Sequence, residues 1–187
     1  MKKKVIISII AFSLLIGGTV LTNAKPKSNL AKMWGNVLSK DYEKKESKKN
    51  NEYRISLYGK ISEKTEEIND IAEEGKDILI ATDEIDKAEE FYKINGNDEE
   101  VAKEKAKSYV EGQNALYIEA IKKGYDVTDK ELDQYIAELK ETVSTAENRE
   151  VAQDIIDSFD SEEDYWKYER ELYKKLLPIQ KYVKKLE

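Results

Sequence analysis

Two predicted helices meet within the stretch Glu119-Ala-Ile-Lys-Lys-Gly-Tyr-Asp-Val-Thr-Asp-Lys-Glu-Leu-Asp-Gln-Tyr-Ile136. Gly124 is expected to end the first helix, because glycine readily adopts the left-handed conformation that closes a helix. Thr128 and Glu131 have the spacing of a capping box, in which each side chain accepts a hydrogen bond from a free backbone N–H. The second helix is therefore predicted to begin here, with one apolar face formed by Leu132, Tyr135, Ile136 and Leu139.

Similar signals divide the chain upstream of this stretch. Thr82 is a candidate N-cap for a helix that runs to about Ile94 and is closed by Gly96. Asp98 is expected to begin the long helix that Gly124 ends. The apolar residues of that long helix recur at spacings of three and four, which predicts one buried face.

Two more helices are predicted downstream. Apolar residues between 151 and 159 mark a short one, and Ser161-Glu-Glu-Asp164 is a weaker capping box that begins the last. The 187 residues include only 8 Gly and 2 Pro, which disfavours a turn-rich β-sandwich. We therefore predict an all-α fold, an irregular bundle of about five to six helices with a polar N-terminal lead-in.

The lead-in and the start of the domain follow less regular patterns. Residues 25–52 are predicted to be a polar tether or a frayed helix, because 41–51 has almost no apolar side chain to bury. Trp34 and its apolar neighbours have helical spacing, which makes a short docking helix the alternative. Residues 53–187 are assigned to the helical domain, with strand and helix both open for its first residues and helix favoured from Ser62 to Gly75.

The first 24 residues have the layout of a secretory signal peptide. Three lysines precede an apolar run from Val5 to Ile16, and Thr22-Asn23-Ala24 supplies small residues for cleavage after Ala24. An uncleaved membrane anchor is the alternative, although the apolar stretch is shorter than the roughly 20 residues that span a bilayer. We expect a protein that is secreted or associated with the cell envelope, without stable membrane insertion after cleavage.

Composition excludes several functional classes. The chain has no Cys and no His, so it lacks disulfides, the usual zinc ligands and any Ser-His or Cys-His nucleophile pair. Its net charge is −7, and loss of the three leader lysines makes it −10, which disfavours binding to nucleic acid or to anionic membranes. No glycine-rich phosphate loop is present, and the acidic clusters do not have the spacing of a calcium loop. We predict no metal and no cofactor.

The stretch from Glu119 to Ile136 resembles the SurA-type N-terminal chaperone domain, which also occurs in extracytoplasmic foldases of the PrsA type. A second, weaker match runs from Ser161-Glu-Glu-Asp-Tyr165 to Leu176-Leu-Pro-Ile-Gln-Lys-Tyr182, and the resemblance covers residues 77–186. It implies a helical domain that binds unfolded polypeptides. Two departures are that the strand expected before the first helix is faint at 76–82, and that no parvulin-type isomerase domain follows before Glu187, so isomerase activity is not expected.

These observations together predict an exported, ATP-independent, chaperone-like protein that is not an enzyme. Its expected partners are unfolded or nascent exported polypeptides. Tyrosine combines apolar area with a polar tip, and 12 tyrosines suit an aromatic groove that binds many sequences. The groove is predicted between helices 98–124, 129–143 and 162–187, and its candidate residues are Tyr109, Leu116, Tyr117, Tyr135, Ile136, Leu139, Tyr165, Trp166, Leu172, Tyr173 and Leu176.

Three alternatives stay open at this point. Most tyrosines could simply line the core of the bundle, with their hydroxyl groups at its edge. The protein could be an envelope-associated structural or adaptor protein that binds one specific partner. It could also be a glycan-acting enzyme, since a pair of carboxylates is enough for that chemistry, although no motif nominates a pair among 39 acidic residues.

Overall fold

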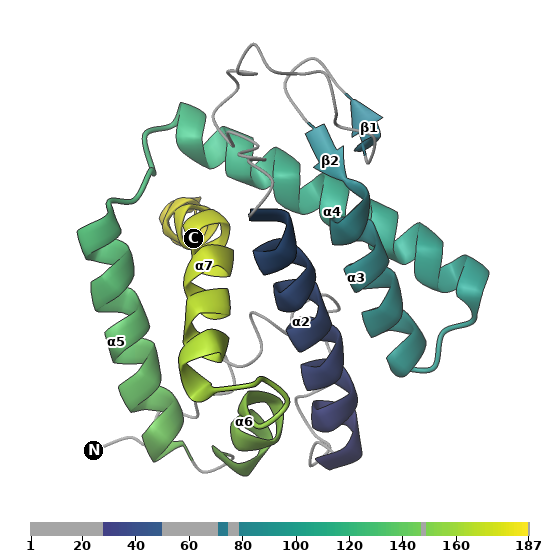
Figure 1. The fold of residues 1–187 in the computed structure, drawn as a ribbon. Coiled ribbons are helices and arrows are strands. Elements are labelled where there is room, and N and C mark those ends of the chain that lie inside the picture. The colour runs from purple at the N-terminus through teal and green to yellow at the C-terminus, as the bar shows by residue number, and fades with distance from the viewer. Residues whose placement is uncertain (1–27, 50–70, 75–78, 147–148, 187) are drawn as a thin grey trace.

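The structure, a computed structural model, describes residues 28–49, 71–74, 79–146 and 149–186. Within these residues, six helices form an irregular bundle with a two-stranded sheet at one end (Figure 1). The predicted all-α class is confirmed. The predicted signal peptide, residues 1–24, lies outside the described residues. Among the described helices, none has the length and hydropathy of a membrane span.

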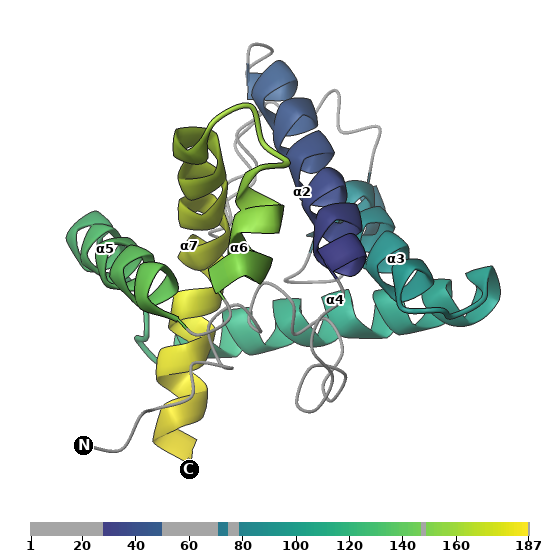
Figure 2. The ribbon, with the colours of Figure 1, turned by 90° about the horizontal axis from the view of Figure 1, so that it is seen from below.

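Helices α3 (Thr82–Ile94) and α4 (Glu99–Lys122) begin and end where the sequence signals predict. Gly96 has a φ of +88° in the turn between them, a conformation that favours glycine. The side chain of Asp98 accepts a hydrogen bond from the backbone N–H of Val101 at 3.0 Å and so caps α4. Figure 2 shows α4 lying across the bundle, with the C-terminal end of α7 extending past it, and α4 packs against both α3 and α7.

The capping box at Thr128 is present and begins α5 (Asp129–Thr145). The Thr128 N–H donates to Glu131 Oε2 at 2.9 Å, and the Glu131 N–H donates to Thr128 Oγ1 at 3.2 Å. Gly124, with a φ of +80°, ends α4 just before it. These local bonds turn the chain so that α5 packs along α7 through a stripe of four buried residues: Leu132, Ile136, Leu139 and Val143.

Helix α6 (Arg149–Ile156) is short and leads to α7 (Glu162–Leu186), the longest helix described. The Asp164 N–H donates to Ser161 Oγ at 3.1 Å, which is one half of the predicted second capping box, and the Asp164 carboxylate accepts from the Ser161 hydroxyl at 2.6 Å instead of from a backbone N–H. Helix α7 continues through Pro178 and is buried along much of its length. Because α4 and α5 both pack against it, α7 is the central element of the bundle (Figure 1).

The N-terminal segment differs from a simple tether. Residues Ser28–Lys49 form helix α2, and its first half buries Ala31, Trp34 and Leu38 in the core. The docking-helix alternative therefore describes this segment better than the tether. Helix α2 packs against α3 and α6, so residues far apart in the sequence lie side by side in the core.

The helix expected up to Gly75 is wrong at its end. Residues Ile71–Glu74 form strand β1, which pairs antiparallel with strand β2 (Leu79–Ala81). Pairing between two strands satisfies backbone groups that an isolated acidic helix end would leave to water. Strand β2 also corresponds to the faint strand predicted at 76–82. The strand or helix predicted between residues 53 and 70 lies outside the described residues.

Replacement of Gly35 by Ala in α2 is expected to destabilise the protein. A Cβ atom at this position would lie near Ser158 Oγ and 3.0 Å from the Ile155 Cα atom of α6. Overpacking of this kind costs about 1–3 kcal/mol. Gly112→Ala in α4 is the matched control: nothing lies within 4 Å of its added Cβ. That variant should gain about 1 kcal/mol from helix propensity. Urea denaturation of both variants measures the difference, and equal stabilities would contradict the close approach of α2 and α6.

Candidate functional site

A cleft of about 70 Å³ lies where α2, α3, α4 and α7 meet. It is largely apolar. The apolar side chains that the four helices contribute are Trp34, Leu38, Ala88, Val110, Leu172 and Leu176. Four segments that are distant in the sequence thus build one depression, and we refer to it below as the cleft.

Each charged side chain at the cleft already has a partner of opposite charge. Lys175 Nζ lies 3.0 Å from Glu84 Oε1, which joins α7 to α3. Asn114 Nδ2 also donates to Glu84 at 3.2 Å. Burial opposes ionisation of Glu84, but the charge and hydrogen bond of Lys175, the hydrogen bond from Asn114 and the charge of Lys87 together outweigh it, so the pKa of Glu84 is held below its ordinary value. Lys87, the second lysine of the cleft, donates to Asp41 at 3.2 Å and to the Tyr168 hydroxyl at 3.3 Å.

Two polar atoms of cleft residues have no hydrogen-bond partner. They are the indole N–H of Trp34, a donor, and Oε1 of Gln113, an acceptor, and both are buried. A buried polar group without a partner costs about 1–3 kcal/mol. A neutral ligand that offers both an acceptor and a donor would relieve this cost, whereas a charged ligand would compete with ion pairs already formed.

The structure brings only some of the predicted groove residues together. Tyr109, Leu172 and Leu176 line the cleft. Leu116 lies on the outer face of α4 with 36% of its surface exposed, and Tyr135 is half-buried, with its ring centroid 4.8 Å from that of Tyr173. The others are buried in the core and do not line the cleft: Tyr117, Ile136, Leu139, Tyr165, Trp166 and Tyr173.

The alternative in which most tyrosines line the core describes only part of this distribution, because four of the ten described tyrosines are buried: Tyr117, Tyr165, Tyr168 and Tyr173. Tyr173 is fully buried, and Tyr165 packs edge-on against both Trp166 and Phe159. Helix α5, one of the three expected walls, does not contribute to the cleft, and α2 and α3 do. Sequence reasoning missed Trp34 and Gln113. The available signal for Trp34 was its helical spacing with Leu38 in an otherwise polar segment.

Glu169 is the second unusual polar group. It lies on α7 with 2% of its surface exposed, and its Oε1 has no hydrogen-bond partner. Burial raises its pKa to about 7, while a hydrogen bond with the Tyr165 hydroxyl and the charge of Lys87 act in the opposite direction. A carboxyl group with a raised pKa is a common feature of active sites, but Glu169 is packed in the core and does not line the cleft.

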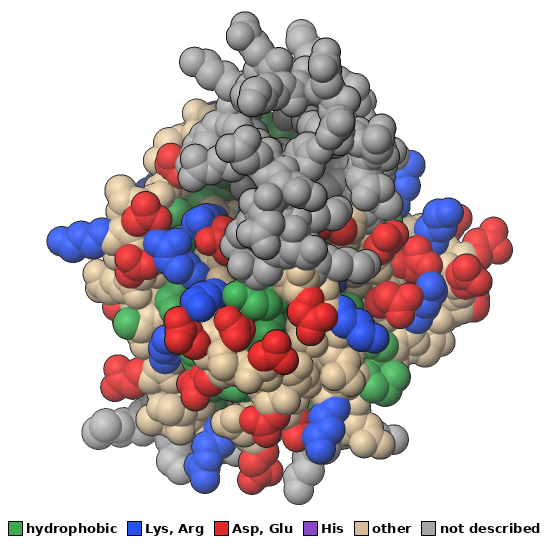
Figure 3. Space-filling model, viewed as in Figure 1, with side chains coloured by type: hydrophobic (Ala, Val, Ile, Leu, Met, Phe, Trp, Pro, Cys, Tyr) green, Lys and Arg blue, Asp and Glu red, His purple; other side chains and the backbone are tan. Residues whose placement is uncertain are grey.

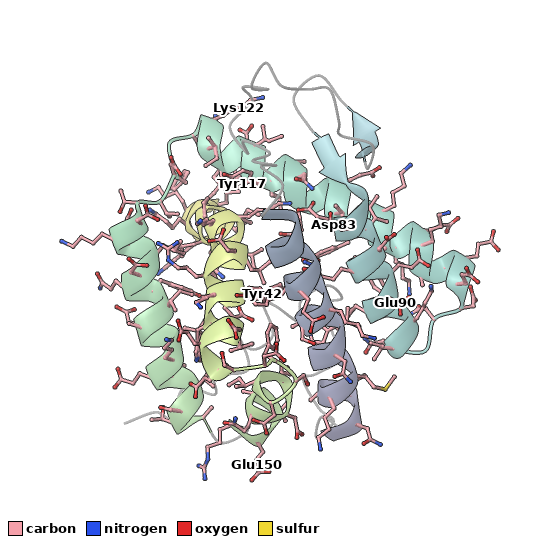
Figure 4. All side chains as sticks on the ribbon, in the orientation of Figure 1. Tyr42, Asp83, Glu90, Tyr117, Lys122 and Glu150 are labelled. Atoms are coloured by element: carbon pink, nitrogen blue, oxygen red, sulfur yellow. The ribbon has the colours of Figure 1, made fainter. Side chains whose placement is uncertain are left out.

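The visible face of the molecule carries both signs of charge. Lys and Arg side chains alternate with Asp and Glu across the described surface, with small apolar areas between them (Figure 3). Figure 4 shows side chains from every helix, with Tyr42 of α2 directed toward α7 and Glu90 on the outer side of α3. Among the described residues, no group of three or more acidic side chains could hold a metal ion.

Comparisons of this chain with family models, with curated proteins and with solved structures find no match. The SurA-type resemblance therefore rests on the sequence motifs alone. The activity that it implies stays a prediction.

Replacement of Glu169 by Gln should change the pH dependence of stability. The native pKa is raised from 4.5 to about 7. The native state therefore binds this proton more tightly than the unfolded state, and the resulting stability is present below pH 4.5 and is lost as pH rises through 7. Because a shift of one pKa unit corresponds to about 1.36 kcal/mol, the free energy of unfolding falls by about 3 kcal/mol at most over this pH range. Glu169→Gln should remove this decline and be more stable than the wild type at pH 8.

Glu131→Gln serves as a control with the opposite sign. The hydrogen bond from the Thr128 backbone and the ammonium of Lys181 lower the pKa of Glu131 to about 2. The stabilisation of the folded state by Glu131 is therefore present above pH 4.5 and is lost as pH falls toward 2. Chemical denaturation between pH 4 and 8 should show the fall in stability with rising pH in the Glu131→Gln variant, which keeps Glu169, and not in the Glu169→Gln variant. A decline of equal size in both would contradict the role of Glu169.

Proposed function

We propose that this protein is a non-enzymatic, ATP-independent binding protein for unfolded or extended polypeptide segments, exported across the cytoplasmic membrane. The cleft is its contact site. The observation that carries the proposal is that Trp34, with an unpaired indole N–H, and Gln113, with an unpaired amide oxygen, both line one apolar cleft. A peptide group supplies one acceptor and one donor, and extended chains present them next to a side chain.

The chemistry of the cleft supports a neutral rather than a charged ligand. Lys175 and Lys87 are both engaged by carboxylates, so an added carboxylate or phosphate would have to break an ion pair. The apolar walls favour aliphatic or aromatic side chains, whose burial gains about 1.5–3 kcal/mol each. This pattern distinguishes polypeptide segments from nucleic acid and from acidic metabolites.

The small volume of the cleft supports weak and reversible binding. About 70 Å³ accommodates part of one side chain at a time, so affinity for any one segment is modest. Modest affinity allows a client to dissociate and fold without ATP. The alternation of charges over the surface helps to keep a complex with an unfolded client in solution.

The same small cleft is also compatible with an adaptor that recognises one residue of one partner. The two functions differ in their range of ligands. A chaperone-like protein binds unrelated unfolded chains weakly, whereas an adaptor retains a single partner in stoichiometric amount.

Suppression of aggregation tests the proposal. Two unrelated, chemically unfolded proteins are diluted into buffer with and without the purified protein, and light scattering is followed. We expect suppression of both clients at near-stoichiometric amounts. No suppression by a protein that circular dichroism shows to be folded would contradict the chaperone function, and a single stoichiometric partner in a pull-down would then support the adaptor.

Two tryptophan substitutions on α4 locate the contact site. Gln113→Trp fills the cleft, whereas Leu116→Trp adds the same side chain on the outer face of the same helix. We expect Gln113→Trp to weaken binding of a labelled unfolded client about tenfold, equivalent to about 1.4 kcal/mol, and Leu116→Trp to have no effect. Fluorescence anisotropy measures both affinities. Weaker client binding by Leu116→Trp, with unchanged binding by Gln113→Trp, would place the contact on the outer face of α4.

A further inference from the structure

Glu169 is a carboxyl group enclosed in the core of the bundle, on α7. It is 2% exposed, and its Oε1 atom has no hydrogen-bond partner. Tyr165 and Tyr173 lie one helical turn before and one turn after it, and the Tyr173 hydroxyl is also buried without a partner. These surroundings favour the neutral form of Glu169, because ionisation would place a charge in a desolvated region lined by aromatic rings.

The cation that acts on Glu169 comes from another helix. Lys87 of α3 favours the ionised form through its charge, and the Tyr165 hydroxyl favours it through a hydrogen bond. Within the described residues, no charged side chain of α4, α5 or α6 acts on this carboxyl group. Helix α5 contributes Tyr135, whose ring centroid lies 4.8 Å from that of Tyr173. Compensation of an ionised Glu169 within this part of the core therefore depends on Lys87.

Lys87 is already in contact with two other helices. Its ammonium lies 3.2 Å from Asp41 Oδ2 of α2, and the two side chains are only 14% and 7% exposed. It also donates to the Tyr168 hydroxyl of α7 at 3.3 Å and lies 5.7 Å from the centre of the Tyr168 ring. Tyr168 directly precedes Glu169 in the sequence. One buried cation therefore binds a carboxylate of α2 and acts on a carboxyl group of α7.

The charge balance of this cluster depends on pH. Glu84 pairs with Lys175 and is also influenced by Lys87, so it offers no further positive charge. When Glu169 is neutral, the two carboxylates of Asp41 and Glu84 are matched by two lysines. When Glu169 is ionised, three carboxylates share the same two lysines, which is unfavourable in a desolvated region. Burial raises the pKa of Glu169 to about 7, so this change occurs near neutral pH.

We propose that ionisation of Glu169 draws Lys87 away from Asp41 and so loosens the packing of α2 against α3, which makes this cluster a pH-sensitive device within the fold. Helix α2 lies between α3 and α7 (Figures 1 and 2), so a change on α7 reaches α2 through the lysine of α3. The coupling is reciprocal: whatever weakens the Lys87–Asp41 contact favours the ionised form of Glu169. The inference does not depend on what the cleft binds.

Hydrogen exchange of the full-length protein at pH 6 and pH 8, corrected for the intrinsic exchange rate, tests the effect on α2. We expect the protection of amides in residues 30–42 to fall about tenfold between the two pH values. Amides of α5 should change less, because the ion pairs of α5 with Arg170 and Lys181 lie outside the cluster. Glu169→Gln should abolish the fall in α2. An equal fall in α2 and α5, no fall in α2, or a fall that persists in Glu169→Gln would overturn the proposal.

Asp41→Asn tests the reciprocal effect. It releases Lys87 to Glu169, so the pH at which Glu169 titrates should fall by about one pH unit. Carbon-13 NMR of the glutamate carboxyl groups measures this midpoint, and the Glu169 signal is the one absent from Glu169→Gln. Asp154→Asn is the matched control, because it removes another carboxylate that pairs with a lysine of α2, Lys32, outside the cluster. Its midpoint should equal that of the wild type. Equal shifts in both variants, or no shift in a folded Asp41→Asn, would overturn the proposal. If Asp41→Asn does not fold, the exchange experiment decides alone.

Discussion

The burial of α7 is the constraint on which the rest of the structure depends. Nine of the 15 residues from Tyr165 to Ile179 are buried, and α4 and α5 both pack against this helix. A polar group on the buried side of this helix is shielded from water, so it is costly unless it has a partner inside the protein. The positions of the surrounding helices follow from how those partners are supplied.

Buried polar contacts join the helices that apolar packing alone would leave free to slide. Lys175 of α7 reaches Glu84 of α3, and Lys87 of α3 reaches both Asp41 of α2 and Tyr168 of α7. Ion pairs of this kind add little net stability compared with apolar packing, but one partner without the other is strongly unfavourable. They therefore specify the register of α2, α3 and α7 relative to one another. Among the described residues, buried atoms of four side chains have no hydrogen-bond partner: Glu169, Tyr173, Trp34 and Gln113.

The buried atoms without a hydrogen-bond partner have different consequences. Glu169 is enclosed in the core, so its missing partner affects the proton that it binds and the stability of the fold. Trp34 and Gln113 line the cleft, so their missing partners bear on the proposed binding site. Trp34 also packs edge-on against Phe91 of α3. The packing of α2 and the proposed binding site thus share this side chain.

The sequence by itself determined most helix boundaries from Thr82 onward, because caps act over a few residues; the exception is α6, which has no predicted cap and spans Arg149–Ile156. Gly96, Asp98, Gly124, Thr128 and Ser161 each stop or start a helix through bonds within one turn. It also determined the all-α class through composition and periodicity. The strand at Ile71–Glu74 was not predictable in this way, since it depends on pairing with β2.

Only the tertiary structure decided which apolar side chains form the core and which border a cleft. Tyr109 and Tyr173 look alike in the sequence, yet one lines the cleft and the other is fully buried, because burial depends on helices that are distant in the chain. The docking of α2 and the position of Gln113 depend on the same long-range packing. Periodicity identifies the buried face of a helix, but it does not identify the element that covers that face.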